Sequence, residues 1–309
     1  MKRKMEISEL IFKIIAYILL IIFAAMCVYP LIYALSSMFS SYDALNKGEV
    51  ILWPVGFQTE AVMFVLSSSK FWVMYANTLF VTFVGTIWCM VYSILGAYAL
   101  SKKRLMGRHG WNFFLVFTMW FSAGVIPTFV NYQQTAHVFA TFVGGNVTNV
   151  DMKWLIVIAM GMNATNVILL RNSFEGVPSE IEEAARIDGA TELQVLMNVY
   201  IPMSKATIAT VALFFGISRW NGYFWAYKVT NWAGQDYSWP VQVYIRDFMQ
   251  DNTVLVNNSI AEDADVASAA EGTTITYAMV VFAMIPILVI YPFIQKYFAK
   301  GVNMGGVKE

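Results

Sequence analysis

The sequence predicts an all-α integral membrane protein with six transmembrane helices. Three observations support this prediction: an apolar composition, six long apolar stretches, and an uneven distribution of basic residues among the segments between them. Of the 309 residues, 58% are hydrophobic and only 13% are charged, whereas a soluble domain is typically about 45–50% apolar and about 25% charged. The composition therefore argues against a soluble fold.

Six stretches are long and apolar enough to cross a bilayer, which takes about 20 residues of helix. Each must be helical, because the hydrocarbon core offers no water to the backbone. The first follows a basic start like that of a signal peptide, but no small-residue cleavage site follows it, so we expect it to be retained. The predicted spans, within a single transmembrane domain of residues 1–309, are residues 10–38, 71–100, 111–130, 152–170, 206–227 and 275–298.

Basic residues indicate the orientation of these spans, since cytoplasmic loops carry an excess of Lys and Arg. They cluster before the first span, after the second and after the sixth, which predicts that both termini face the cytoplasm. An acidic external loop of residues 229–273 is expected before the sixth span. The clustered bases are Lys2, Arg3, Lys4, Lys102, Lys103, Arg104, Arg108, Lys296, Lys300 and Lys308.

Several functional classes are not indicated by the sequence. The 20 basic residues equal the 20 acidic ones, so the overall charge predicts no binding of nucleic acid. Cys27 and Cys89 lie in apolar runs without a second ligand at a suitable spacing, which predicts no metal site. His109 and His137 fall on opposite sides of the membrane in the predicted topology, which argues against a catalytic pair. We therefore expect no catalytic residues and no enzyme.

The segment between the fourth and fifth spans is predicted to form two short helices. Ser179 with Glu182, and Thr191 with Gln194, have the spacing of capping boxes, in which each side chain bonds the backbone N–H of the other residue. Gly189 can adopt the left-handed conformation that ends a helix. The second helix is expected to stop before the proline at position 202, because proline restricts the residue that precedes it.

Both of these helices are expected to be amphipathic, with acidic polar faces. The alternative interpretation, a helix pair lying on lipid headgroups, predicts Lys and Arg on the polar face. A DNA-binding helix pair would also be basic. An acidic pair is better suited to docking in a groove of a soluble protein. The acids expected on the outer face are Glu175, Glu180, Glu182, Glu183, Asp188 and Glu192.

One run in this segment resembles a known motif. Glu183-Ala184-Ala185-x-x-Asp188-Gly189-Ala190, followed by Val199-x-Ile201-Pro202, resembles the EAA loop of permeases from ATP-binding-cassette (ABC) importers. Asn77-Thr78-Leu79 in the second span is similar to the maltose-type (carbohydrate) permeases. Ile126-Pro127-Thr128 and the run from Tyr291 to Val302 are most similar to the LplC/YtcP branch of that family.

This resemblance implies the type I ABC importer permease fold and a place in the bacterial cytoplasmic membrane. Members work as two related permease subunits with two cytoplasmic ATPase subunits, which bind ATP and Mg, and an extracytoplasmic solute-binding protein. This chain is expected to bind no cofactor, since it has no G-x-x-x-x-G-K-[ST] phosphate loop. The coupling loop, residues 175–202, would contact the ATPase through Glu182, Glu183, Ala184, Ala185, Asp188, Gly189, Ala190 and Pro202.

Polar and aromatic residues inside the fourth and fifth spans are candidates for a solute path, because buried polar groups in membranes tend to face a cavity. Amide and guanidinium donors beside aromatic rings suit sugars, and we expect an oligosaccharide. Hydrogen bonding between helices and anchoring at the headgroups are the alternative roles. The candidates are Asn163, Asn166, Arg219, Trp220, Asn221, Tyr223 and Trp225.

Arg219 is the only formal charge well inside the fifth predicted span. Because an unpaired charge is costly at membrane depth, we expect Arg219 either to form an ion pair with the partner permease or to recognise an acidic sugar. A permease for another solute class, such as amino acids, and a membrane scaffold subunit are the alternative functions.

Overall fold

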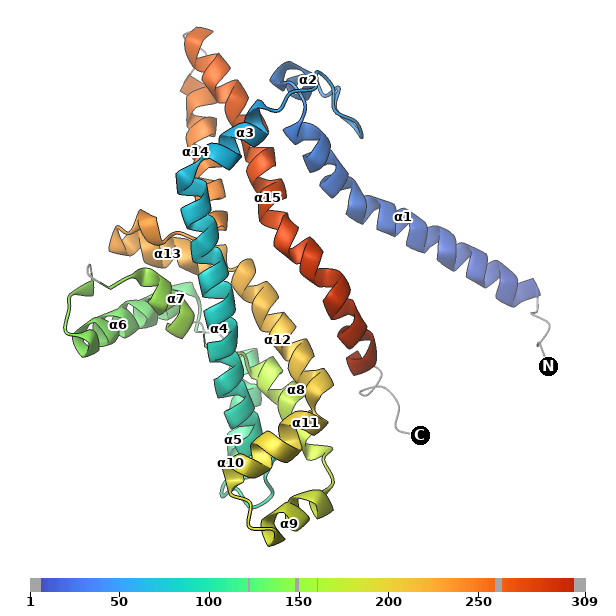
Figure 1. Cartoon of the computed structure of the whole chain (residues 1–309), viewed down its shortest axis with the longest axis vertical. Coiled ribbons are helices and arrows are strands. Elements are labelled where there is room, and N and C mark those ends of the chain that lie inside the picture. Colours follow the sequence, from blue (N-terminus) through green and yellow to red (C-terminus); the bar gives the residue numbers. More distant parts are fainter. Residues whose placement is uncertain (1–6, 122, 148–149, 160, 259–262, 303–309) are drawn as a thin grey trace. The chain divides into compact units, whose positions relative to one another are not determined.

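A computed structural model describes residues 7–121, 123–147, 150–159, 161–258 and 263–302, with the side chains of all of these except residues 252–271 and 293–302. Every regular element in these residues is helical, as the sequence predicts (Figure 1). The chain divides into two compact units, one of Met1–Ser69 with Ile245–Ile285 and the other of Lys70–Tyr244 with Pro286–Glu309.

The first elements along the chain are α1 (Ile7–Met38), α2 (Tyr42–Asn46), α3 (Glu60–Ser67), α4 (Ser69–Ser101), α5 (Arg108–Trp120), α6 (Val125–Val143), α7 (Met152–Ala159) and α8 (Ala164–Glu175). The elements that follow are α9 (Ser179–Ile187), α10 (Glu192–Val195), the π-helical turn η2 (Leu196–Tyr200), α11 (Ile201–Met203), α12 (Lys205–Trp220), α13 (Tyr223–Ala233), the 3₁₀ turn η3 (Asp236–Ser238), α14 (Val241–Asn258) and α15 (Asp263–Val302).

Three segments are individually long and apolar enough to cross a membrane: Ile7–Met38 in α1, Ser69–Ser101 in α4 and Gly272–Pro292 within α15. They correspond to the first, second and sixth predicted spans. Three pairs of helices pass the same test only together, because each pair is bent at a short break. By length and composition, the described residues therefore contain three helices that could cross a membrane, or up to six candidate spans if each bent pair is one.

The third, fourth and fifth predicted spans are not continuous helices, contrary to expectation. α5 and α6 meet at 117°, next to Gly124, whose φ of 84° favours glycine over other residues. α7 and α8 meet at 50°, where the Asn163 side chain caps α8 by accepting a hydrogen bond from the Asn166 N–H at 3.3 Å. In the fifth predicted span, α12 ends at Trp220 and α13 begins at Tyr223.

Much of the segment of residues 229–273, the predicted external loop, is helical in the described residues, through α14 and the start of α15. Val241, Val243 and Tyr244 are buried at the start of α14, so packing favours the helix there. Among the bases used to predict orientation, Lys2, Arg3, Lys4 and Lys308 lie outside the described residues, and Lys296 and Lys300 lie where side chains are not described.

In the first unit, α1 exposes most of its apolar side chains. Phe12, Leu20 and Phe23 are 73%, 62% and 67% exposed, respectively. Soluble proteins rarely expose contiguous apolar surface of this extent. The pattern is the one expected of a helix whose surroundings are lipid or another membrane subunit.

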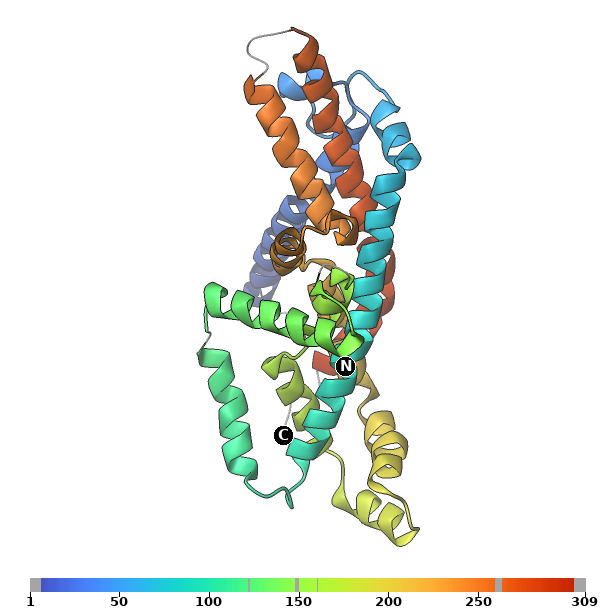
Figure 2. The same cartoon turned by 90° about the vertical axis from the view of Figure 1, so that its left-hand side faces the viewer.

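The core of the second unit connects α4 to the helices between α8 and α12. Leu170 and Phe174 of α8 are almost completely buried, and burial of each such side chain contributes about 1.5–3 kcal/mol. The rings of Tyr98, Phe174 and Tyr200 meet edge to face, with centroids 5.1–6.5 Å apart. Figure 2 shows α9, α10 and α11 at one end of this unit, beyond the end of α4. The aromatic contacts therefore join this end to the helices above it.

A set of hydrogen bonds in the second unit attaches the segment between α13 and α14 to α4. Asn77 Nδ2 donates to the carbonyl oxygens of Tyr237 and Trp239 at 2.8 and 3.1 Å. The N–H of Val241 donates to Thr78 Oγ1 at 2.7 Å. The sequence singles out Asn77 and Thr78 only through a resemblance. In the structure they provide hydrogen-bond partners for backbone groups between α13 and α14.

Asn77→Leu is expected to lower the free energy of unfolding by about 2–4 kcal/mol, because two buried carbonyl groups lose their donor. The measurement is the Tm of the purified protein in detergent. Thr82→Val is the matched control on the same helix, since the Thr82 hydroxyl is buried without a hydrogen-bond partner in the described part of the chain. Equal Tm values for the two variants would contradict this role of Asn77.

Candidate functional site

The helices α9, α10, η2 and α11, residues Ser179–Met203, form what we call the angled helix element. Its second half begins as the sequence predicts: Thr191 Oγ1 accepts from the Gln194 N–H at 3.4 Å, and Gln194 Oε1 accepts from the Thr191 N–H at 2.8 Å. Gly189 has a φ of 82°, which confirms the predicted left-handed end of α9. The reversal between α9 and α10 is therefore encoded locally.

Two local predictions for this element are wrong. Ser179 does not cap α9 with Glu182; the N-cap is Pro178, without a side-chain cap, and Glu182 bonds other partners. The second helix does not stop before Pro202, because η2 and α11 continue it to Met203. In a π-helical turn the hydrogen bonds skip one more residue than in an α-helix, and the chain then accommodates a proline, which has no N–H to donate.

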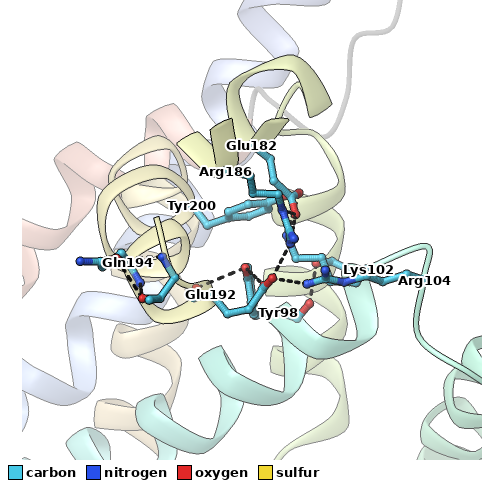
Figure 3. Close-up of polar contacts among 10 residues, drawn as sticks. Tyr98, Lys102, Arg104, Glu182, Arg186, Glu192, Gln194 and Tyr200 are labelled. Carbon is cyan, nitrogen blue, oxygen red and sulfur yellow. Dashed lines mark hydrogen bonds and ion pairs between the residues drawn. The ribbon is translucent and has the colours of Figure 1, made fainter. Parts of the chain in front are cut away.

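The Glu182 carboxylate points into the protein and meets three donors (Figure 3). Lys102 Nζ lies 2.8 Å from Oε2, the Tyr200 hydroxyl donates to Oε2 at 2.5 Å, and Arg186 Nη2 donates to Oε1 at 2.8 Å. Lys102 Nζ also lies over the rings of Tyr98 and Tyr200, 4.2 and 3.9 Å from their centroids. We call Lys102, Glu182, Tyr98 and Tyr200 the lysine clamp.

The lysine clamp is a largely buried ion pair, with side-chain exposures of 10% for Lys102 and 15% for Glu182. Burial on its own would raise the pKa of Glu182, but hydrogen bonds from Lys102, Tyr200 and Arg186 outweigh it and hold the pKa at about 2. Glu182 is therefore ionised at neutral pH. Removing one member of such a pair leaves a charge without its partner, which costs about 3–5 kcal/mol in buried pairs.

The structure corrects the predicted outer acidic face. Besides Glu182, Glu192 pairs with Arg104 and with Arg186, and Glu175 pairs with Arg108. These acids neutralise bases of the same chain. The outer face is acidic through Glu180, Glu183 and Asp188, which are exposed and form no ion pair within the described residues.

Exposed apolar side chains lie beside these acids. Ile187, Leu193 and Met197 are 87%, 64% and 54% exposed, although the amphipathic pattern predicts apolar residues on an inner face. Leu196 and Tyr200 are buried. The exposed side of the angled helix element is thus an apolar patch with an acidic border, a composition suited to a partner protein.

The residues predicted to couple to an ATPase fall into two groups. Glu183, Ala184, Asp188, Gly189 and Pro202 are exposed. By contrast, Ala185 and Ala190 pack against the core of the second unit, and Glu182 belongs to the lysine clamp. Sequence reasoning did not identify Lys102, Tyr98 and Arg186 as members of this site. The only sequence feature that pointed towards them was the cluster of basic residues after the second predicted span.

A cavity of about 570 Å³ lies at the break between α7 and α8. It is lined by four predicted solute-path residues, Asn163, Asn166, Arg219 and Trp225. The ring of Tyr132, from α6, meets that of Trp225 edge to face with centroids 5.0 Å apart. Tyr132 lies beyond the predicted third span, and its role was not predicted. Amide groups beside two aromatic rings suit a polyhydroxylated solute.

The other three predicted solute-path residues do not line this cavity. Trp220 is buried and lines a separate cavity of about 530 Å³. Asn221 is the C-cap residue of α12 and donates to the Ile217 carbonyl at 3.1 Å. Tyr223 starts α13 and is half-buried.

Arg219 bonds groups of its own chain. Its guanidinium donates to the carbonyl oxygens of Ile156 and Val157 at 2.7 and 3.2 Å and to Cys89 Sγ at 3.0 Å. These carbonyls lie in the last turn of α7, where a cation also complements the helix dipole. These hydrogen bonds at the break between α7 and α8 account for the burial of Arg219. No acid on a solute or on a partner subunit is needed to explain it.

Comparisons with known proteins identify the family. The model of the family described as "Binding-protein-dependent transport system inner membrane component" matches residues 6–304. The chain belongs to this family. It is accordingly a membrane-embedded transport subunit, and ATP hydrolysis is the task of a separate subunit. The predicted resemblance to ABC-importer permeases is confirmed.

The similar proteins agree with the predicted branch. The Bacillus subtilis polygalacturonan/rhamnogalacturonan transport system permease protein YtcP is 34% identical, covering 96% of this chain and 98% of its own. The B. subtilis protein LplC is 31% identical over 92% of this chain and 90% of its own. A solved bacterial ABC transporter "involved in the import of the acidic polysaccharide alginate" has a chain that is 38% identical, with a TM-score of 0.79 and coverage of 96% of this chain and 100% of that one.

Gly85→Ala tests the packing of Arg219 against α4. A Cβ at Gly85 would lie 3.2 Å from Arg219 Nε, and the hydrogen bonds of the guanidinium prevent it from moving away. We expect a lower Tm in detergent. Gly96→Ala on the same helix is the control, because a Cβ there meets nothing within 4 Å, and Gly→Ala inside a helix stabilises by about 0.5–1 kcal/mol. A Gly85→Ala variant that melts like Gly96→Ala would show that Arg219 is not tightly held.

Proposed function

We propose that the chain is one permease half of an ABC importer for oligosaccharides in the bacterial cytoplasmic membrane. The observation that carries the proposal is the exposed apolar patch of the angled helix element, bordered by Glu183 and Asp188 within the EAA-like motif. Family membership supplies the class of transport system. An exposed surface of this kind on a membrane subunit needs a soluble partner, and the ATPase of the system is the partner we propose.

In the proposed topology the chain acts as one transmembrane domain with six spans and cytoplasmic termini. The pair α5 and α6 and the pair α7 and α8 each count as one span, and α12 is the fifth; Glu192–Met203, the other half of the third bent pair, belongs to the angled helix element and lies outside the membrane in this topology. Lys102, Lys103, Arg104 and Arg108 between the second and third spans support placing the angled helix element on the cytoplasmic side. The large exposed apolar surface of α1 suits contact with lipid and with a second permease subunit.

The proposed complex contains a second homologous permease, two ATPase subunits and an extracytoplasmic solute-binding protein. ATP and Mg would bind only to the ATPases. Ile187, Leu193 and Met197 would enter the ATPase groove, and Glu183 and Asp188 would make polar contacts at its rim. Ala184 and Gly189, small and exposed, would allow close approach of the ATPase backbone.

The proposed solute is an oligosaccharide that contacts Asn163, Asn166, Trp225 and Tyr132 in the cavity at the α7–α8 break. Several similar proteins carry sugar names: YtcP is named for polygalacturonan and rhamnogalacturonan, and the 26% identical B. subtilis GanQ for galactooligosaccharides. The solved relative is named for an acidic polysaccharide. An acidic oligosaccharide is therefore the first solute to assay. The alternatives of an amino-acid permease and a scaffold subunit gain no support from these observations.

Ile187→Asp tests the proposed docking surface. A carboxylate in place of the exposed apolar side chain would have to be desolvated in the ATPase groove, and we expect at least a tenfold weaker association, equal to about 1.4 kcal/mol. The measurement is the amount of ATPase subunit that co-purifies with the tagged permease. Met106→Asp is the matched control, since Met106 is equally exposed, at 91% against 87%, but lies between α4 and α5. Normal co-purification with Ile187→Asp would contradict the proposal.

Trp225→Ala tests the cavity. Loss of an aromatic face for the sugar ring is expected to raise the KM for oligogalacturonate uptake in proteoliposomes about tenfold, equal to about 1.4 kcal/mol, with ATPase co-purification unchanged. Asn221→Ala serves as the comparison, because Asn221 lies in the same region of the sequence but outside the cavity. Identical KM values for the two variants would remove the cavity from the solute path.

A further inference from the structure

The angled helix element is attached to the second unit unevenly. Its second half is anchored in the core, since Val195, Leu196 and Tyr200 are buried. Its first half, α9, contains no fully buried residue. Gly189, with its left-handed backbone, joins the two halves. The side-chain contacts of α9 therefore decide whether it moves with the rest of the protein.

The strongest described contact of α9 is the lysine clamp. Lys102 directly follows α4, whereas Glu182 lies in the first turns of α9, 80 residues later, and their charged atoms are 2.8 Å apart. Tyr200 of η2 donates to the same carboxylate oxygen and lies under the same ammonium group. Three segments therefore meet at one ion pair: the end of α4, the start of α9 and the turn before α11.

The neighbouring charges reinforce this arrangement. Arg186, one turn along α9, donates to both Glu182 and Glu192. Arg104, two residues after Lys102, pairs with Glu192, and the Tyr98 hydroxyl donates to Glu192 Oε2 at 2.9 Å. The groups that bond Glu182 are thus two cations and one hydroxyl donor, and the nearby Glu192 is balanced by Arg104 and Arg186.

We propose that Glu182 is a positioning residue that locks α9 to the cytoplasmic end of α4, so that displacement of α9 by the ATPase is transmitted to the second span. This inference rests on the proposed function and deepens it by assigning different roles to the two adjacent acids, Glu182 and Glu183. Glu183 faces outward to the ATPase, and Glu182 faces inward and holds the element rigid. The lysine clamp is the contact through which a displacement of the angled helix element is transmitted to α4.

Protonation of Glu182 does not open the clamp in the neutral range. The pKa of Glu182, held at about 2, lies below the value of a free glutamate, so ionisation of Glu182 contributes stability at neutral pH and loses it only as the pH falls towards 2. Glu182 therefore stays ionised between pH 6 and 8.

The test uses the complete complex, with binding protein and ATPases, in proteoliposomes. Glu182→Gln removes the charge, Lys102→Met removes its partner, and Lys102→Arg keeps a cation at the same place. We expect Glu182→Gln and Lys102→Met to retain ATPase co-purification but to lower oligogalacturonate moved per ATP hydrolysed at least tenfold. Lys102→Arg is expected to restore this ratio to within a few-fold of wild type. Lys103→Met, at the exposed lysine that follows Lys102, is the matched control with a normal ratio.

A second measurement follows α9 without solute. Spin labels at Ser179→Cys and Met106→Cys, in a Cys27→Ser background, report the distance between the start of α9 and the α4–α5 turn. We expect one narrow distance distribution in the otherwise unchanged protein and a broad one with Glu182→Gln. A narrow distribution in both, or loss of ATPase co-purification with Glu182→Gln at an unchanged distance, would overturn the proposal and make Glu182 an ATPase contact.

The two proposals fail separately. If the ATPase does not co-purify with the wild-type chain, the proposed function is wrong, and the distance measurement still decides whether Glu182 locks α9. If the ATPase co-purifies and the solute-to-ATP ratio of Glu182→Gln equals that of wild type, the proposed function stands and the positioning role of Glu182 is wrong.

Discussion

A polar group that lies away from water must find its partner inside this chain, and the described structure depends on that constraint. Leaving a buried donor or acceptor unpaired costs about 1–3 kcal/mol, and more for a charged group. Asn77 meets the constraint by donating to two carbonyls of a distant turn. Arg219 meets it by donating to carbonyls at the end of α7. Lys102 meets it with one carboxylate and two aromatic faces. In each case the polar group also joins segments that are far apart in the sequence.

The same constraint explains why the candidate cavity lies where a span is broken. A continuous helix satisfies its own backbone, so it offers a solute only side chains. Where α7 ends and α8 begins, terminal carbonyl and N–H groups need partners from outside the helix. Asn163 supplies an acceptor for the start of α8, and Arg219 supplies donors for the end of α7. The polar side chains that make the break possible are also the ones that give the cavity its hydrogen-bonding character.

The angled helix element shows how far local patterns predict a site. The capping box of Thr191 and Gln194 forms as its spacing predicts. Glu182 has the same spacing from Ser179, but an ammonium group 80 residues away offers a charged, largely buried bond instead. Spacing in the sequence cannot rank a local hydrogen bond against a distant ion pair. For the same reason three of the six acids expected on the outer face pair with bases of the same chain.

Composition and local pattern determined that this chain is an all-α membrane protein with long apolar helices, that short helices follow Pro178 and Thr191, and that the chain resembles the importer permeases. These properties depend on side-chain hydropathy and on residues within a few positions of each other. Only the tertiary structure decided where the spans break, that Glu182 turns inward while Glu183 stays exposed, and that Asn163 and Trp225 share a cavity from which Asn221 is excluded. Those outcomes depend on which distant segments meet, because burial and pairing are settled by contacts that no local pattern contains.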